Sequence, residues 1–304
     1  MNKKEFTSLI KSEVEVQTHC KVQIKETIKN NGHTLTGLLI QEEGCNIIPT
    51  IYLERYYEEY ESGEEISNLV EQIIRAYNQN KIVKNEDISF FQDFQKVKER
   101  IRYKLINYEA NKQLLQQIPH TKVLDLAKVY YVPVELGGIS EFGSILIQNT
   151  HIHLWKVTDE EVKKAAEKNT PKQLPVQIEA MDKIIMQLLQ IQNNTEEQEL
   201  FQQLISERKT APMYVISNTQ KLYGATVMCY ENVLKNVAEV IGTDLFILPS
   251  SLHELIVISR ENSMEPKELR EMVETINQTE VDIEERLSDN VYIYHKLTNT
   301  IEII

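Results

Sequence analysis

The stretch VQIKETIKNNGHTLTGLLI, residues 22–40, decides the fold class that this sequence predicts. Over residues 22–28 apolar side chains alternate with polar ones, which is the pattern of a half-buried β-strand. Asn30-Asn31-Gly32 follows, and these residue types tolerate the backbone angles of a tight turn. A second strand over 34–40 completes an antiparallel hairpin. Because hairpins interspersed with helices are typical of α+β proteins, we predict an α+β fold of mixed helices and short, mostly antiparallel strands rather than a doubly wound parallel sheet.

Helical spacing of apolar residues recurs on both sides of the hairpin. It predicts helices over 3–15, 64–78, 177–190, 231–241 and 266–277, and one that begins at a Thr158/Glu161 capping box. Pro49-Thr50 predicts the start of a further helix that runs to residue 61, and a long charged helix is predicted from Phe90 to Gln117. Strands are predicted over 122–136, 144–149, 213–216, 244–248 and 254–259, with a turn at Gly137-Gly138, a linker over 169–176 and a terminal hairpin over 291–304.

The order of these segments suggests how the chain is organised. Its 304 residues are enough for one large domain or two ordinary ones. We predict an N-terminal α+β lobe over 1–85, a helical connector over 86–118 and a C-terminal α+β lobe over 119–304.

Charge and cysteine content narrow the classes of partner. The chain carries 33 Lys and Arg against 46 Asp and Glu, a formal net charge of −13. Such a balance repels nucleic acid and anionic membrane surfaces, although one basic cluster lies in the predicted long helix: Lys96, Lys98, Arg100, Arg102 and Lys104. The cysteines Cys20, Cys45 and Cys229 have no metal-binding spacing. With no apolar run long enough for a signal or a membrane helix, the sequence predicts a cytoplasmic protein that binds neither nucleic acid nor membrane.

Motifs for cofactors and metals are missing from the sequence. There is no glycine-rich phosphate loop, no HExxH and no CxxC, so we expect no cofactor. His151 and His153 would place two imidazoles on one side of a predicted strand, but no third ligand is indicated, so we expect no metal site.

One segment carries the residue types of a nucleophilic site. Residues 248–255, LPSSLHEL, contain Ser250, Ser251 and His253. A hydrolase would need one serine within hydrogen-bond reach of His253. The alternative interpretation is a turn between two buried strands, in which the serine hydroxyls bind backbone groups.

Another segment suggests a contact surface. Tyr52, Tyr56 and Tyr60 recur every four residues in an acidic predicted helix, and tyrosine is enriched at protein interfaces. The alternative is an ordinary amphipathic helix with tyrosines at the edge of the core. We expect the side with Leu53 and Tyr57 to pack on the helix of 64–78, while part of the Tyr52/Tyr56/Tyr60 side stays accessible.

Several long blocks together resemble a known family. These are residues 30–63, 97–120, 153–171 and 223–258. They resemble a bacterial domain-of-unknown-function family, number 5688, over nearly the whole chain. The second half more faintly resembles another such family, number 1444, through Trp155, Glu160, Glu161, Pro249 and His253. The resemblance implies a cytoplasmic bacterial protein that is one family unit, and it brings no activity or catalytic residue with it.

These observations favour a soluble, acidic, non-enzymatic protein-binding or adaptor module whose partner is another protein, preferably a basic one. The alternative is a hydrolase-like enzyme that uses His253 with Ser250 or Ser251. A third alternative is an inhibitor whose acidic surface mimics nucleic acid.

Overall fold

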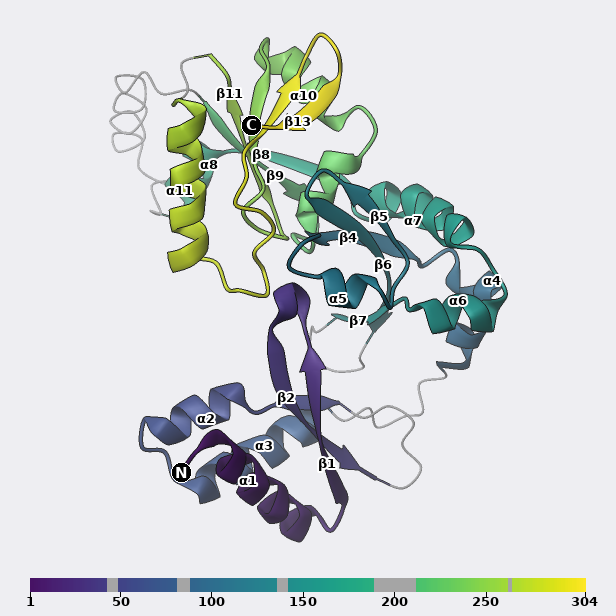
Figure 1. Ribbon diagram of the computed structural model, residues 1–304, viewed down its shortest axis with the longest axis vertical. Coiled ribbons are helices and arrows are strands. Elements are labelled where there is room, and N and C mark those ends of the chain that lie inside the picture. Colours follow the sequence, from purple (N-terminus) through teal and green to yellow (C-terminus); the bar gives the residue numbers. More distant parts are fainter. Residues whose placement is uncertain (43–48, 81–87, 136–141, 189–211, 262–263) are drawn as a thin grey trace. The chain divides into compact units, whose positions relative to one another are not determined.

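The computed structural model describes residues 1–42, 49–80, 88–135, 142–188, 212–261 and 264–304 (Figure 1). The chain divides into two compact units. Unit 1 comprises Met1–Val97 and Val132–Ile145, and unit 2 comprises Lys98–Tyr131 and Leu146–Ile304. The predicted α+β class is confirmed, because helices and mostly antiparallel sheets occur throughout. The predicted boundaries of lobes and connector stay a prediction.

Unit 1 is built on the hairpin that the sequence predicted. β1 (Lys21–Ile28) pairs antiparallel with β2 (Thr34–Gln41), with Ile28 opposite Thr34 across the turn. Three helices accompany the sheet, α1 (Lys3–Thr18), α2 (Glu54–Glu61) and α3 (Ile66–Asn80). Their inward side chains form one core with those of the strands, from Phe6 and Ile10 of α1 to Leu69 and Ile73 of α3. This matches the helices predicted over 3–15 and 64–78.

The helix predicted from Pro49 is wrong in its first turn. Thr50–Tyr52 forms a short strand, β3, which pairs with β2 and places Ile51 opposite Leu38. α2 begins only at Glu54. Thr, Ile and Tyr all favour a pleated, half-buried position. The pairing partner lies 13 residues earlier (51 − 38), beyond the i+3 and i+4 spacings on which a helix prediction rests.

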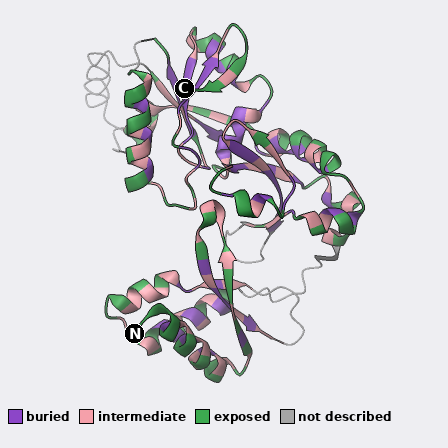
Figure 2. Ribbon diagram, in the orientation of Figure 1, coloured by how far each residue is buried: buried purple, intermediate pink, exposed green. Residues whose placement is uncertain are grey.

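Unit 2 contains an antiparallel six-stranded sheet in the order β13-β12-β10-β11-β9-β8. The strands are β8 (Val176–Ala180), β9 (Met213–Asn218), β10 (Leu245–Leu248), β11 (Leu255–Ser259), β12 (Tyr292–His295) and β13 (Thr300–Ile303). β10, β11 and β12 consist almost entirely of buried residues (Figure 2). Helices α10 (Val233–Ile241) and α11 (Pro266–Thr279) and the terminal hairpin β12–β13 confirm the predicted pattern.

A second sheet has β6 (Leu126–Glu135) between β4 (Arg102–Asn107) and β5 (His120–Val123), and β7 (Phe142–Leu146) also pairs with β6. Residues 88–117 therefore do not form the long helix that was predicted. They form η2 (Ile88–Gln92), α4 (Phe94–Val97), β4 and α5 (Lys112–Leu115). β4 alternates in burial at Arg102, Tyr103 and Lys104, and its pairing with β6 outweighs the helical spacing of its apolar residues.

Other predicted boundaries shift in the same region. α7 (Asp159–Gln173) starts at the predicted Thr158/Glu161 capping box but continues through Pro171, so the linker predicted over 169–176 is wrong. The helix predicted over 177–190 is β8 followed by α8 (Met181–Leu188). Residues 224–229 form a 3-10 helix, η4 (Gly224–Cys229). The turn predicted at Gly137-Gly138 lies outside the described residues.

No helix within the described ranges combines the length and the apolar character needed to cross a membrane.

Candidate functional site

α2 is a surface helix with an unusual composition. Three of its eight residues, ERYYEEYE, are tyrosines, yet none of its residues is buried. A helix with this many aromatic side chains normally buries its apolar face against the rest of the protein. In α2 the tyrosine-bearing face is only partly buried.

The predicted tyrosine ladder is divided between three environments. Tyr52 lies in β3 rather than in the helix, with the ammonium of Lys29 4.3 Å from its ring centroid. Tyr56 is partly buried against the core of unit 1, and burial raises its pKa. Tyr60 stacks on Tyr57 at 6.2 Å and lies 5.4 Å from the ring of Phe6 in α1. Tyr56 and Tyr60 therefore share one face of α2, whereas Tyr52 lies outside the helix.

The predicted packing of the other side is half right. Leu53 is fully buried in the core to which α3 contributes. Tyr57, however, packs edge-on against Phe6 of α1 at 5.3 Å, and its hydroxyl donates to the backbone carbonyl of Met1 at 3.4 Å. α1 therefore packs against this side of α2 in addition to α3.

Glutamates are frequent in α2 and directly after it. Lys3 pairs with Glu54 at 2.9 Å, and Arg55 pairs with Glu59 at 2.8 Å. Among the described residues, no lysine or arginine forms an ion pair with four further carboxylates of this segment: Glu58, Glu61, Glu64 and Glu65. We name these four residues the acidic edge.

The His253 segment lies between β10 and β11, which are adjacent antiparallel strands. The ring of His253 stacks on Tyr223 with centroids 5.8 Å apart. Its Nδ1 lies 3.3 Å from the backbone N–H of Tyr223, and its Nε2 lies 3.5 Å from Oε1 of Glu285. Because Nδ1 accepts that N–H, the ring proton is on Nε2, directed at the carboxylate.

The serines beside His253 take part in backbone structure. Oγ of Ser251 accepts the backbone N–H of His253 at 3.0 Å, and the carbonyl of Ser250 accepts the N–H of Leu287 at 3.0 Å. Oγ of Ser217 donates to the carbonyl of His253 at 2.6 Å. Gly224 packs so close to Ser217 and to that carbonyl that a Cβ would clash with both. These contacts form a tightly packed connection, and no hydrogen bond joins either serine to the His253 ring within the described residues.

The predicted histidine pair lies on a helix. His151 and His153 belong to α6 (Asn149–Trp155), so the strand expected there is wrong. Nδ1 of His151 accepts the backbone N–H of Gln148 at 3.1 Å, which is part of the helix cap. In the part of the chain that the structure describes, no group of three or more His, Cys, Asp or Glu side chains is placed to hold a metal ion.

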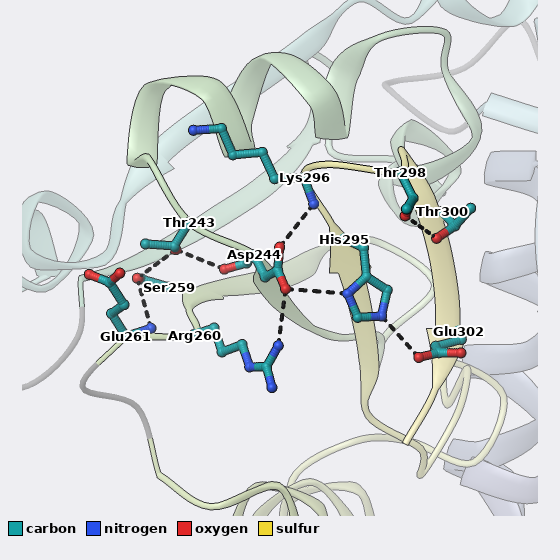
Figure 3. A network of polar contacts seen from close by, with 10 residues as sticks. All are labelled: Thr243, Asp244, Ser259, Arg260, Glu261, His295, Lys296, Thr298, Thr300 and Glu302. Atoms are coloured by element: carbon teal, nitrogen blue, oxygen red, sulfur yellow. Dashed lines mark hydrogen bonds and ion pairs between the residues drawn. The ribbon is translucent and has the colours of Figure 1, made fainter.

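A polar network at the terminal hairpin was missed by the sequence analysis (Figure 3). Oδ2 of Asp244 accepts from Nη1 of Arg260 at 3.0 Å and faces Nδ1 of His295 at 3.2 Å. Its Oδ1 accepts the backbone N–H of Lys296 at 3.0 Å. On the other side of the ring, Nε2 of His295 lies 2.9 Å from Oε1 of Glu302. The network ties β13 and β12 to the segments flanking β10 and β11.

The charges in this network support one another. The hydrogen bond to Glu302 is the main reason why the pKa of His295 is raised, and Asp244 adds to it. Burial alone would raise the pKa of Asp244, but hydrogen bonds from Lys296, Arg260 and His295 hold it below its ordinary value. When His295 is protonated, its imidazolium lies between two carboxylates and stabilises the hairpin. Both ring nitrogens are already engaged, so the network is a structural clamp.

A second cluster that was missed centres on Asp125, at the turn between β5 and β6. Its carboxylate accepts from Oγ of Ser288 at 2.6 Å, from Nδ2 of Asn290 at 2.8 Å and from the hydroxyl of Tyr292. These partners lie 163 to 167 residues along the chain, so no local pattern could reveal them.

Comparison with known proteins adds one finding. No curated protein and no solved structure matches this chain. The fainter resemblance of the second half to family 1444 stays a prediction. Residues 3–296 match a family of unknown function, DUF5688, and because the match covers nearly the whole chain, the chain belongs to that family.

Proposed function

We propose that this chain is a non-enzymatic protein-binding module that contacts a basic partner through α2 and the acidic edge. The observation that carries the proposal is the absence of any buried residue in α2, although three of its eight residues are tyrosines. The part of its tyrosine side chains that stays accessible supplies apolar area with polar tips, which suits a protein contact.

The negative charge of this segment indicates a basic partner. The ion pairs of this segment use Glu54 and Glu59, and the acidic edge remains as uncompensated negative charge on α2 and directly after it. A partner that presents lysines or arginines around an apolar centre complements both features. The charge would mainly speed association and select the partner, while the rings supply most of the affinity.

The hydrolase alternative has less support. Both ring nitrogens of His253 already face other groups, the N–H of Tyr223 and the carboxylate of Glu285. Ser251 is engaged with the backbone of His253 itself. A serine activated by this histidine would need a rearrangement of the packed connection around Gly224.

Site-specific photo-crosslinking in the native host tests the proposal. A photoreactive residue is placed at Glu58 in one variant and, as a control, at Leu297 in another, where the side chain is 94% exposed in unit 2. We expect one predominant crosslinked protein from position 58, joined through a segment rich in Lys or Arg. Equal products from both positions, or no product from position 58, would overturn the proposal.

A further inference from the structure

Unit 2 contains a cavity that none of the features above uses. Its volume is about 640 Å³, within the range of roughly 300–1,000 Å³ typical of small-molecule sites. The walls come from the two sheets and the helices beside them: Tyr103, Lys128, Glu167, Lys168, Pro171, Pro175, Val176, Cys229, Tyr230, Glu231 and Val233.

Two tyrosines give the cavity an aromatic wall. Tyr103 and Tyr230 are 1% and 7% exposed, and their rings are nearly perpendicular with centroids 6.4 Å apart. The hydroxyl of Tyr230 donates to the carbonyl of Leu174 at 3.0 Å, which fixes that ring. Among the described residues, the hydroxyl of Tyr103 has no hydrogen-bond partner, so it is available to a bound molecule.

The titratable groups of this wall are uncharged at neutral pH. Burial raises the pKa of Tyr103 and raises the pKa of the Cys229 thiol to about 11. Cys229 is therefore a protonated apolar contact rather than a nucleophile.

The charged groups of the cavity already balance. Nζ of Lys128 donates to Oε1 of Glu167 at 3.3 Å and lies 5.0 Å from the ring centroid of Tyr103. The side chain of Lys128 is only 12% exposed, so this ammonium is largely removed from water. Lys168 forms an ion pair with Glu99, which lies outside the lining, at 3.7 Å. The lining therefore carries two lysines, Lys128 and Lys168, and two glutamates, Glu167 and Glu231.

This balance selects the charge of a ligand. An anion near Lys128 would also face the carboxylate of Glu167, and a cation near Glu167 would face the ammonium. An uncharged acceptor meets neither penalty, because the ammonium of Lys128 has three donors and Glu167 takes one of them. A flat ring in the ligand fits the perpendicular tyrosines, which favour stacked and edge-on contacts.

We propose that this cavity binds an uncharged aromatic molecule that carries a carbonyl oxygen as hydrogen-bond acceptor. Lys128 and Tyr103 donate to the oxygen, and the ring lies against Tyr103, Tyr230 and the prolines of the wall. The site is independent of the protein contact proposed above, because it uses no residue of unit 1.

Three probes with the same ring test the proposal: benzamide is neutral, benzoate is an anion and benzamidine is a cation. Each is titrated into the full chain by ligand-observed NMR. Val176→Trp, at a position 37% exposed on the wall, fills the cavity, and Val240→Trp, on the 87% exposed Val240 of α10, is the matched control. We expect benzamide to bind at least about tenfold more tightly than either charged probe, and only V176W to abolish its binding.

Tyr103→Phe gives a second reading that keeps the ring and its packing. It should weaken benzamide binding about three- to tenfold by removing one hydrogen bond. Absent benzamide binding, equal or tighter binding of benzoate or benzamidine, or unchanged benzamide binding in both V176W and Y103F would overturn the proposal.

Discussion

His295 shows how the surroundings of a single residue set its charge, since each of its ring nitrogens faces a carboxylate. The protonated ring is the form that can donate to both Asp244 and Glu302. Of the groups packed around it, Arg260 and Lys296 bind Asp244 and so keep that carboxylate ionised. The folded state therefore binds a proton at His295 more tightly than the unfolded chain does.

The stability of unit 2 should consequently depend on pH through His295. The stabilisation is fully present below the ordinary histidine pKa of 6.5 and is lost as pH rises through the raised pKa of the folded state. Urea unfolding followed by fluorescence measures it, because Trp155 is the one tryptophan of the chain and is buried in unit 2. His295→Gln should remove this part of the pH dependence. An unchanged slope in that variant would contradict the clamp.

Tyr292 and Tyr294 provide a matched pair on the same strand. Tyr292 donates to the carboxylate of Asp125, whereas Tyr294 donates to the neutral amide oxygen of Asn299 at 2.9 Å. A hydrogen bond to a charged acceptor is the stronger one, so Tyr292→Phe should cost about 1.5–3 kcal/mol and Tyr294→Phe about 0.5–1.5 kcal/mol. Both values come from the same urea experiment. Equal costs would show that the Asp125 cluster adds nothing beyond an ordinary hydrogen bond.

At the scale of elements, α2 packs on the rest of unit 1 through partly buried tyrosines, and it has no row of fully buried residues. Tyr57 and Tyr60 pack on Phe6, so α1 and α2 stabilise each other. This arrangement leaves the acidic edge at the surface while the rings fix the orientation of the helix.

Tyr60→Ala should therefore destabilise unit 1 by about 1–3 kcal/mol, because a half-buried ring loses its contacts with Phe6 and Tyr57. Hydrogen exchange of α1 and α2 amides reports on this unit directly. Tyr60→Phe keeps the ring and should leave the exchange rates close to those of the unaltered chain. Unaffected protection of α1 in Tyr60→Ala would show that the ring is not part of the packing.

Elements defined by local pattern were predictable and elements defined by distant partners were not. α1, α3 and the β1–β2 hairpin follow from spacing and turn residues that lie within a few positions of one another. β4 was mistaken for helix because its pairing with β6, which places Arg102 opposite Tyr131, is set by tertiary structure.

The same distinction applies to the candidate sites. The acidic tyrosine helix was visible in the sequence, although Tyr52 proved to belong to β3. The Asp125 cluster and the cavity around Tyr103 are formed by side chains from distant segments of the chain. No local sequence motif predicts either of them.

At the scale of the whole molecule, net charge decides which partners can approach. A formal charge of −13 acts on any incoming protein, and at the acidic edge it coincides with partly exposed tyrosines of α2. Reversing the same number of charges at the acidic edge and elsewhere on the chain therefore separates two effects. One is the general attraction of a basic protein to the acidic chain, and the other is the specific contact at α2.

The most direct test measures the affinity of the partner crosslinked at position 58 for two triple variants. One carries E58K, E61K and E65K, and the other carries E254K, E261K and E280K at exposed positions of unit 2. Calorimetry is done at about 0.1 M and about 1 M salt, where charges are screened beyond about 10 Å and about 3 Å. We expect only the first variant to lose affinity, by about tenfold or more, and the loss to shrink at high salt. Equal losses in both variants, or none in the first, would contradict the proposed contact through α2 and the acidic edge.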